Sequence, residues 1–317
     1  MTASPGRTYP PVHTYSIVAR DPETGQLGVA VQSHYFSVGS IVSWAEAGVG
    51  AVATQSVALV DYGPRGLALM REGLSARQAL DALLANDPGR DVRQVAMVDA
   101  RGNVAAHTGS RCIPAAGHVE GDGFSVQANL MVDGSVWPAM KRAFEESRGD
   151  LAERLLAALD AGQAAGGDIR GQQSAALLVV SGERSPEPWR GRVFDLRVED
   201  HPEPLVELRR LVRLRRAYRL ADESDELLAA GDYATARARL EEALTLAPEN
   251  DELRFWAALT LFRVGEEAHA LPMLREVFAR GPQWAELVPR LAPLGLLPES
   301  PEAVGRILAQ RPDGSST

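Results

Sequence analysis

Cysteine and lysine are nearly absent from this sequence of 317 residues. The one cysteine, Cys112, has no second thiol for an internal disulfide, and it excludes a cysteine-rich zinc site. No neighbour in sequence is placed to lower the pKa of this thiol, so we interpret Cys112 as a buried small residue rather than a nucleophile. Lys141 is the only lysine among 33 basic residues. Almost any function that needs a lysine, such as phosphate binding in a P-loop, is therefore excluded.

Long apolar runs and a surplus of positive charge are also missing. The longest apolar run, residues 175–180, is far shorter than the ~20 residues of a membrane span, so we expect no membrane association. Residues 1–13, MTASPGRTYPPVH, lack the apolar stretch of a secretory signal, which predicts a cytoplasmic protein. A net charge of −9 argues against nucleic-acid binding. The six histidines lack metal-ligand pairing on a helix, so we expect no metal and no cofactor unless distant residues converge.

Short apolar runs rich in β-branched residues extend to about residue 199, bounded by Gly, Pro and Asp. Such runs predict β-strands. We expect strands at residues 15–19, 27–32, 50–56, 94–98, 104–107, 124–128, 175–181 and 193–198. The segments DPETG at 21–25 and DARG at 99–102 predict hairpin turns, because Pro and Gly favour the dihedral angles of turns.

Three helices are predicted among these strands. Ser75 and Gln78 form the pattern of a capping box ahead of apolar residues at helical spacing. The second helix is expected at 136–147, and the third begins at Asp150 and ends near glycines 162–167. Because the strands come in hairpins and the helices in two groups, the pattern indicates a layered α+β domain with mostly antiparallel sheets.

A helical repeat follows Pro202 and Pro204, which block the continuation of strands. Several residue pairs recur 34 positions apart: Gly231 and Gly265, Ala234 and Ala268, Leu228 and Phe262, Leu240 and Leu274, Leu244 and Phe278, and Pro248 and Pro282. This period is typical of tetratricopeptide repeats (TPR), each built from two antiparallel helices. Flanking helices at 204–220 and 284–297 are expected to complete the array. The first flank is rich in arginine, such as Arg209, which either forms a solvated face or pairs with acidic groups of the first domain or of a second subunit.

The sequence thus predicts four segments. They are an N-terminal extension at 1–13, an α+β domain at 14–200, a TPR-like helical domain at 205–297 and a C-terminal tail at 298–317.

Polar residues gather at the ends of the expected strands of the first domain. They are Thr14 and Ser16; Gln32, Ser33 and His34; Thr54, Gln55 and Ser56; His107 and Thr108; Gln127 and Asn129; Gln173 and Ser174. A single polar residue in a strand usually bonds to a neighbouring backbone group. Six such clusters, if the strand ends meet, are instead typical of a binding site in an apolar setting.

Five segments carry a resemblance to a known family: HTYSIVARDPETGQLGVAVQSHYFSVGS, EAGVGAVATQS, DYGPRGL, VDARGNVAAHTG and GGDIRGQQSAALLVV. Over residues 12–200 they resemble an uncharacterised bacterial and archaeal family, a domain of unknown function within the N-terminal nucleophile (Ntn) hydrolase superfamily. The resemblance implies a four-layer αββα sandwich and no particular substrate. Some members carry a C-terminal segment labelled peptidoglycan-binding, but the 34-residue period here favours TPR.

Ntn hydrolases attack amides with the first residue of the chain, whose own α-amine acts as the base. The resemblance implies that Thr14 is the nucleophile and that Ser33, Gln127 or Asn129 supports the oxyanion. His34 stands where family members often have a lysine; it can shuttle protons, or it is simply a half-buried sheet histidine. Asp168 falls at a junction that the superfamily places beside the nucleophile, or it is a turn residue.

Two functions follow from this pattern. In the first, the protein hydrolyses a small non-peptide amide, with catalytic roles for Thr14, Ser33, His34 and Asp168. Binding roles then fall to Ser16, Gln32, Gln55, Gln127, Asn129 and Ser174. In the second, the first domain is an inactive binding module and the TPR-like domain docks a protein partner, because residues 1–13 block the amine of Thr14. A homo-oligomer is expected in either case.

Overall fold

The chain forms two compact units, Met1–Val212 and Arg213–Thr317, in a computed structural model that describes residues 14–295, 297 and 300–312. The expected N-terminal extension, 1–13, lies outside the described residues. The division falls inside helix α6 (Pro204–Ala229), later than the linker expected at 200–205. The reason is that Leu205, Leu208 and Val212 of this helix are buried in the core of the first unit.

Two antiparallel sheets make up the centre of the first unit. The larger has the strand order β10-β9-β2-β1-β8-β7, and the smaller has the order β3-β4-β5-β6. The strands are β1 (Thr14–Arg20), β2 (Leu27–Ser33), β3 (Ser43–Glu46), β4 (Gly50–Ser56), β5 (Arg93–Asp99), β6 (Val104–Thr108), β7 (Gly117–Gly121), β8 (Phe124–Ala128), β9 (Ser174–Val180) and β10 (Arg192–Val198). The antiparallel arrangement expected from the hairpins is confirmed. Strands β3 and β7 were not predicted, because both are half-buried and neither contains an apolar run.

Two of the helices of the first unit begin at caps that the sequence predicts. The helices of this unit are α1 (Gly39–Val42), α2 (Tyr62–Arg71), α3 (Ala76–Ala85), α4 (Val136–Glu146) and α5 (Leu151–Ala164), with short 3₁₀ turns at Arg90–Val92 and Pro188–Gly191. The capping box of Ser75 and Gln78 is present ahead of α3, and Asp150 caps α5. Helix α2 was missed, because its two glycines weaken a helical pattern. One of them, Gly63, allows close packing, since a Cβ there would lie 2.3 Å from Trp44 Cγ.

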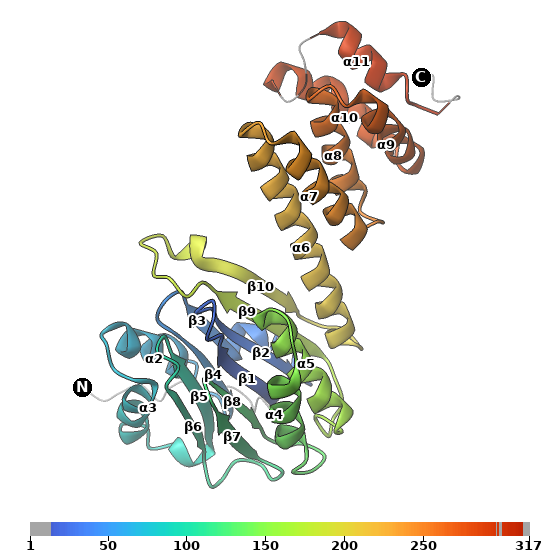
Figure 1. Ribbon diagram of the computed structural model, residues 1–317. Helices are drawn as coiled ribbons and strands as arrows, with labels where there is room; N and C mark the ends of the chain where they lie inside the picture. The colour runs from blue at the N-terminus through green and yellow to red at the C-terminus, as the bar shows by residue number, and fades with distance from the viewer. Residues whose placement is uncertain (1–13, 296, 298–299, 313–317) are drawn as a thin grey trace, which may run out of the picture. The chain divides into compact units, whose positions relative to one another are not determined.

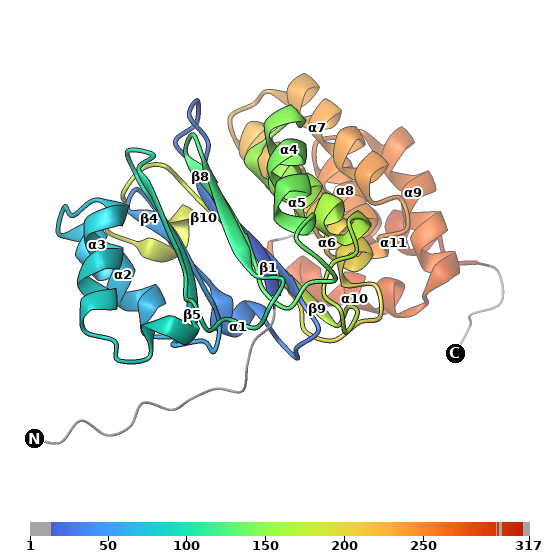
Figure 2. The ribbon, with the colours of Figure 1, turned by 90° about the horizontal axis from the view of Figure 1, so that it is seen from below.

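The two sheets pack face to face, and each carries a pair of helices on its outer face. Helices α4 and α5 pack on β1, β2 and β8, whereas α2 and α3 pack on β4, β5 and β6. Figure 2 shows these layers edge-on, with β4 and β5 facing β1 and β8. Between the sheets lies an apolar core that includes Val29, Val31, Ala53 and Ala96.

The second unit is all-helical, as expected. After the C-terminal part of α6 it contains α7 (Tyr233–Leu246), α8 (Asp251–Arg263), α9 (Glu267–Arg280), α10 (Gln283–Leu291), a 3₁₀ turn at Ala292–Leu294 and α11 (Pro301–Leu308), labelled in Figure 1. Gly231 and Gly265, which are 34 residues apart, have φ angles of 83° and 87°. Glycine adopts this left-handed conformation without the strain of a Cβ, so the repeated glycines end equivalent helices.

The two ends of the helical array differ from the expectation. The first flank divides its contacts, because Leu205 and Leu208 belong to the core of the first unit while Ala217 packs with Ala247 and Leu253 of the second. At the other end, the segment expected as a tail contains α11, whose Ile307 is fully buried in the helical core. The array therefore uses residues beyond 297.

Candidate functional site

Four neighbouring strands of the larger sheet bring polar residues into one row. Thr14 at the start of β1 is the cross-strand partner of Ser33 at the end of β2, and Ser33 is in turn the partner of Ser174 at the start of β9. On the other side, the backbone N–H of Asn129, just after β8, donates to the carbonyl of Thr14 at 3.1 Å. All four residues are fully buried. The row therefore places Thr14 between Asn129 and Ser33.

These side chains face the space between the two sheets. Successive residues of a strand point to opposite faces. On β1, Tyr15 and Ile17 pack against the helices α4 and α5, whereas Val18 packs against the smaller sheet. Thr14 and Ser16 share the face of Val18. Directly opposed residues lie on the same face of a sheet, so Ser33 and Ser174 face the same interior as Thr14.

A hydrogen-bonded network of neutral side chains continues from this row into the interior. Ser16 Oγ donates to Gln55 Oε1 at 2.6 Å and accepts from Gln127 Nε2 at 2.6 Å. Gln127 Oε1 accepts in turn from Ser125 Oγ at 3.0 Å. Gln55 Nε2 donates to the carbonyl of Thr14 at 3.2 Å. The backbone of Thr14 is therefore held from both sheets.

Gln94 on β5 connects the network to the far side of the unit. Its Oε1 accepts from Gln55 Nε2 at 2.8 Å and from Asn129 Nδ2 at 2.9 Å. Its Nε2 donates to the Ala128 carbonyl at 2.8 Å and to Thr108 Oγ1 at 2.9 Å. Gln94 thus fixes the side chains of Gln55 and Asn129, the two residues that bind the Thr14 carbonyl.

The network ends at a histidine. Thr108 Oγ1 and His118 Nδ1 lie 2.8 Å apart. Burial lowers the pKa of the His118 imidazole, which favours its neutral form at pH 7. Neither Gln94 nor His118 was among the expected site residues. The feature that could have identified Gln94 as a site residue is its polar side chain at an inward-facing position of the strand expected at residues 94–98.

Asp168 and His34 lie beside the row of strand ends. Asp168 is 3% exposed, and its Oδ2 accepts from the backbone N–H of His34 at 3.3 Å. Arg170 binds the same carboxylate, with Nε 3.0 Å from Oδ1 and Nη2 2.6 Å from Oδ2. Asp168 is therefore more than a turn residue, because its side chain links two segments 134 residues apart in sequence. The Nδ1 atom of half-buried His34 has no hydrogen-bond partner among the described residues.

Charge near the site also acts on Tyr15, which lies on the helical face of β1. Burial, followed by the charges of Asp160 and Asp168, raises the pKa of Tyr15 well above its usual value. The phenol is therefore protonated, and it donates to Gln163 Oε1 at 2.9 Å. This bond anchors α5 to the strand that begins with Thr14.

Two expected binding residues, Ser174 and Gln32, are not part of the hydrogen-bonded network described above. Ser174 Oγ donates to the Tyr35 carbonyl at 2.5 Å and accepts from the Val38 N–H at 3.1 Å, so it holds the loop that follows His34. Gln32 shares the helical face of β2 with Ala30, opposite to Ser33. Its amide is buried and has no hydrogen-bond partner among the described residues. The structure therefore separates Gln32 from the side chains that surround Thr14.

Three further observations bear on the chemistry of the chain. The half-buried thiol of Cys112 donates to the Arg93 carbonyl at 3.3 Å, and burial raises its pKa, which disfavours a nucleophilic thiolate. Within the described residues, no group of three or more His, Cys, Asp or Glu side chains is arranged to hold a metal ion. No helix of the described chain is long and apolar enough to cross a membrane.

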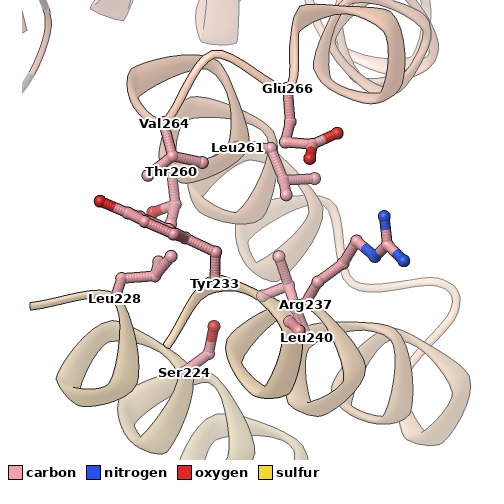
Figure 3. Close-up of a pocket in the computed structure, with 10 residues that line it drawn as sticks. Ser224, Leu228, Tyr233, Arg237, Leu240, Thr260, Leu261, Val264 and Glu266 are labelled. Atoms are coloured by element: carbon pink, nitrogen blue, oxygen red, sulfur yellow. The ribbon is translucent and has the colours of Figure 1, made fainter. Parts of the chain in front are cut away.

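The second unit contains a separate cavity of about 230 Å³ between α6, α7 and α8. Leu228, Leu240, Leu261 and Val264 supply apolar walls, and the hydroxyl of Ser224 points toward it in Figure 3. The aromatic ring of Tyr233 lies on one side of the cavity, and the charged side chains of Arg237 and Glu266 lie on the other. Tyr233 is 58% exposed, and with Trp256, which is 37% exposed, it also lines an adjoining hollow. The helical unit thus offers a groove with two exposed aromatic rings.

Comparisons with known proteins agree with the two units. The family of unknown function called DUF1028 matches residues 14–208, and the tetratricopeptide repeat matches residues 227–290. A crystal structure of protein SPO2555 from Silicibacter pomeroyi, assigned to the DUF1028 family, is 35% identical to this chain. It matches with a TM-score of 0.57 over 63% of this chain and 85% of its own. No curated protein matches. Because the family model covers more than half of the sequence, this chain belongs to the DUF1028 family, with TPR-type repeats at its C-terminal end.

Proposed function

We propose that the first unit is an amide hydrolase of the Ntn type, with Thr14 as its nucleophile and a small non-peptide amide as its substrate. The single observation that carries this proposal is the position of Thr14. It is the first residue of a central strand, it is buried among neutral hydrogen-bonding groups, and its carbonyl is held by Asn129 and Gln55. The sheet and helix layers agree with the αββα architecture of that superfamily.

In the proposed reaction, hydrolysis of the bond between residues 13 and 14 first gives Thr14 a free α-amine. This amine takes the proton of the Thr14 hydroxyl as Oγ1 attacks the carbonyl carbon of the substrate. Ser33 and Asn129, on either side of Thr14, are the candidates to donate hydrogen bonds to the resulting oxyanion. The leaving amine takes the proton as the C–N bond breaks, and an ester on Thr14 remains. Water then hydrolyses that ester and releases the acid.

His34 and Asp168 have supporting roles in this proposal. The carboxylate of Asp168 is already bound by Arg170, so it orients the His34 backbone rather than taking part in proton transfer. An imidazole can both accept and donate a proton, and His34 Nδ1 has no hydrogen-bond partner among the described residues, so we assign His34 the role of a proton shuttle between Thr14 and water.

The test is the mass and activity of the purified protein. We expect the intact mass of active wild-type protein to show that Thr14 is the N-terminal residue. Thr14→Ala should keep the preceding residues and lose hydrolysis of small anilides, whereas Thr14→Ser should be processed and active. Active wild-type protein that retains residues 1–13 would overturn the mechanism.

A second function rests on the other unit. The two exposed aromatic rings, Tyr233 and Trp256, border the groove of the TPR-type repeats, and aromatic residues are enriched at protein interfaces. We propose that the helical unit binds a protein partner there. Tyr233→Ala and Trp256→Ala should weaken that binding, whether or not the first unit is an enzyme.

A further inference from the structure

Large apolar side chains are exposed in the segments that follow His34, Asn129 and Asp168. Within the described part of the first unit, Phe36 is 63% exposed, Ile169 is 60% exposed and Val132 is 51% exposed. Each belongs to a segment that carries a residue of the candidate site: Phe36 follows His34, and Ile169 follows Asp168. Single exposed apolar residues are common, but a group of them beside a polar site is typical of a binding surface.

The segment at 130–132, which follows Asn129, pairs with the segment at 167–169. Met131 and Asp168 form an antiparallel bridge, Ile169 N–H donates to the Leu130 carbonyl at 3.3 Å, and Val132 N–H donates to the Gly167 carbonyl at 3.0 Å. Met131 and Asp168 are buried, at 2% and 3% exposure. Val132 and Ile169 are the chain neighbours of these two buried residues and face outward, whereas Leu130 is half-buried.

Phe36 is fixed beside this pair of segments. The His34 N–H donates to Asp168, and Ser174 Oγ binds the backbone on both sides of Phe36, at Tyr35 and Val38. These bonds fix the backbone on both sides of Phe36, whose side chain is exposed. We call Phe36, Leu130, Val132 and Ile169 the apolar rim.

Backbone strain also occurs within the rim and its loop. Leu130 and Ser37 have φ angles of 57°, in the left-handed region that residues with a Cβ rarely adopt. Such strain costs on the order of 1–3 kcal/mol per residue and is found where a functional geometry requires it. Leu130 follows Asn129, whose N–H binds the Thr14 carbonyl, and it comes two residues before the outward-facing Val132.

We infer that the apolar rim binds an aliphatic acyl chain, so that the substrates of the site are amides of unbranched fatty acids. This inference rests on the proposed function. The rim presents no unpaired charge, because Arg170, beside Ile169, is neutralised by Asp168. An acyl group suits the site better than an apolar amine, since the acyl group stays bound to Thr14 through both steps of the reaction.

The test is a homologous series of primary amides, from acetamide through butanamide and hexanamide to octanamide, with ammonia release as the assay. We expect kcat/KM of mature wild-type protein to rise about twofold or more per added methylene, below the roughly fourfold limit of complete burial. Phe36→Ser and Ile169→Ser should each lower the octanamide-to-acetamide ratio about tenfold. Leu294→Ser is the matched control, because Leu294 is 70% exposed in the other unit.

Binding separates this inference from the proposed function. Calorimetry on Thr14→Ala protein from which residues 1–13 have been removed, which cannot form the ester, should show that octanamide binds and acetamide does not, and that Phe36→Ser in that background removes the difference. If this difference in binding is found while mature wild-type protein releases no ammonia from any amide of the series, the rim is retained and the catalytic proposal is overturned. Equal rates and equal binding along the series would overturn the rim. So would conversion of an oligomer to a monomer by Phe36→Ser or Ile169→Ser, because the rim would then be a subunit interface.

Discussion

Replacement of Gln94 by leucine is expected to destabilise the first unit strongly. The side chain is buried and accepts from Gln55 and Asn129 while it donates to Thr108 and the Ala128 carbonyl. Gln55 Nε2 keeps its contact with the Thr14 carbonyl. The Asn129 amide and the Ala128 carbonyl each lose the Gln94 bond in an interior without bulk water.

The magnitude follows from the cost of losing those bonds. Gln94 also donates to the Gly117 carbonyl at 3.1 Å, so leucine removes five hydrogen bonds, and at about 0.5–1.5 kcal/mol each their loss costs about 2.5–7.5 kcal/mol. Burial of the added leucine carbons offsets part of this cost, so the free energy of unfolding falls by about 2–5 kcal/mol in total. That is a large share of the roughly 5–15 kcal/mol by which a domain is usually stable.

The assay is urea unfolding followed by hydrogen–deuterium exchange of peptides from β1 and β5, which reports on the first unit alone. Arg142→Leu is the control, because Arg142 is exposed on α4 and the change should shift the free energy of unfolding by less than about 0.5 kcal/mol. If Gln94→Leu were no more destabilising than this control, the network would contribute nothing net to folding.

The remaining predictions concern helix ends and ion pairs. Arg209→Ala should cost no more than about 1 kcal/mol, and less in high salt, because its pair with Asp160 is partly exposed; a salt-independent loss of several kcal/mol would contradict this. Gly231→Ala should destabilise the helical unit by about 1 kcal/mol through its positive φ. Gly305→Ala, in open space within α11, should stabilise it by about 1 kcal/mol, and thermal unfolding distinguishes the two signs. Ile307→Ala should cost about 2–5 kcal/mol if α11 is part of the folded array, and almost nothing if it is a loose tail.

Much of the fold was predictable because local signals coincide with burial. The strand at residues 50–56, which begins with an apolar run, was predicted with the correct bounds. The capping box at Ser75 and the 34-residue glycine spacing correctly located helices. Strand β7 has no such signal, since its residues are half-buried and its pairing depends on β8, to which a tight turn connects it.

The candidate site was predictable only in part. The polar strand ends pointed to Thr14, Ser33 and Asn129, which the sheet register brings together. The register also determines which face each residue occupies, and the cluster at 32–34 spans both faces, so Gln32 points away. Gln94 was missed for a different reason. Its contacts with Asn129 and the Ala128 carbonyl are made across the space between the two sheets, and the sequence does not show which strands oppose each other there.

The composition of the network limits which groups can transfer protons in the proposed reaction. Between the sheets it consists of glutamine, asparagine, serine and threonine side chains, and it reaches a neutral histidine only at its far end. A charged group in that interior would lose its hydration at a cost of several kcal/mol, whereas amides satisfy donors and acceptors without charge. Such a network holds atoms in place but has no group that ionises near neutral pH in its centre. In the proposed reaction, proton transfer therefore takes place at the strand ends, by the α-amine of Thr14 and by His34.

The activity of the mature protein should then rise with pH through the range of an α-amine, about 7.7–8.0, because only the neutral amine accepts the hydroxyl proton. His34→Gln, which cannot take up a proton, should lower kcat and leave that rise in place. A pH profile without this rise would show that the amine is not the base.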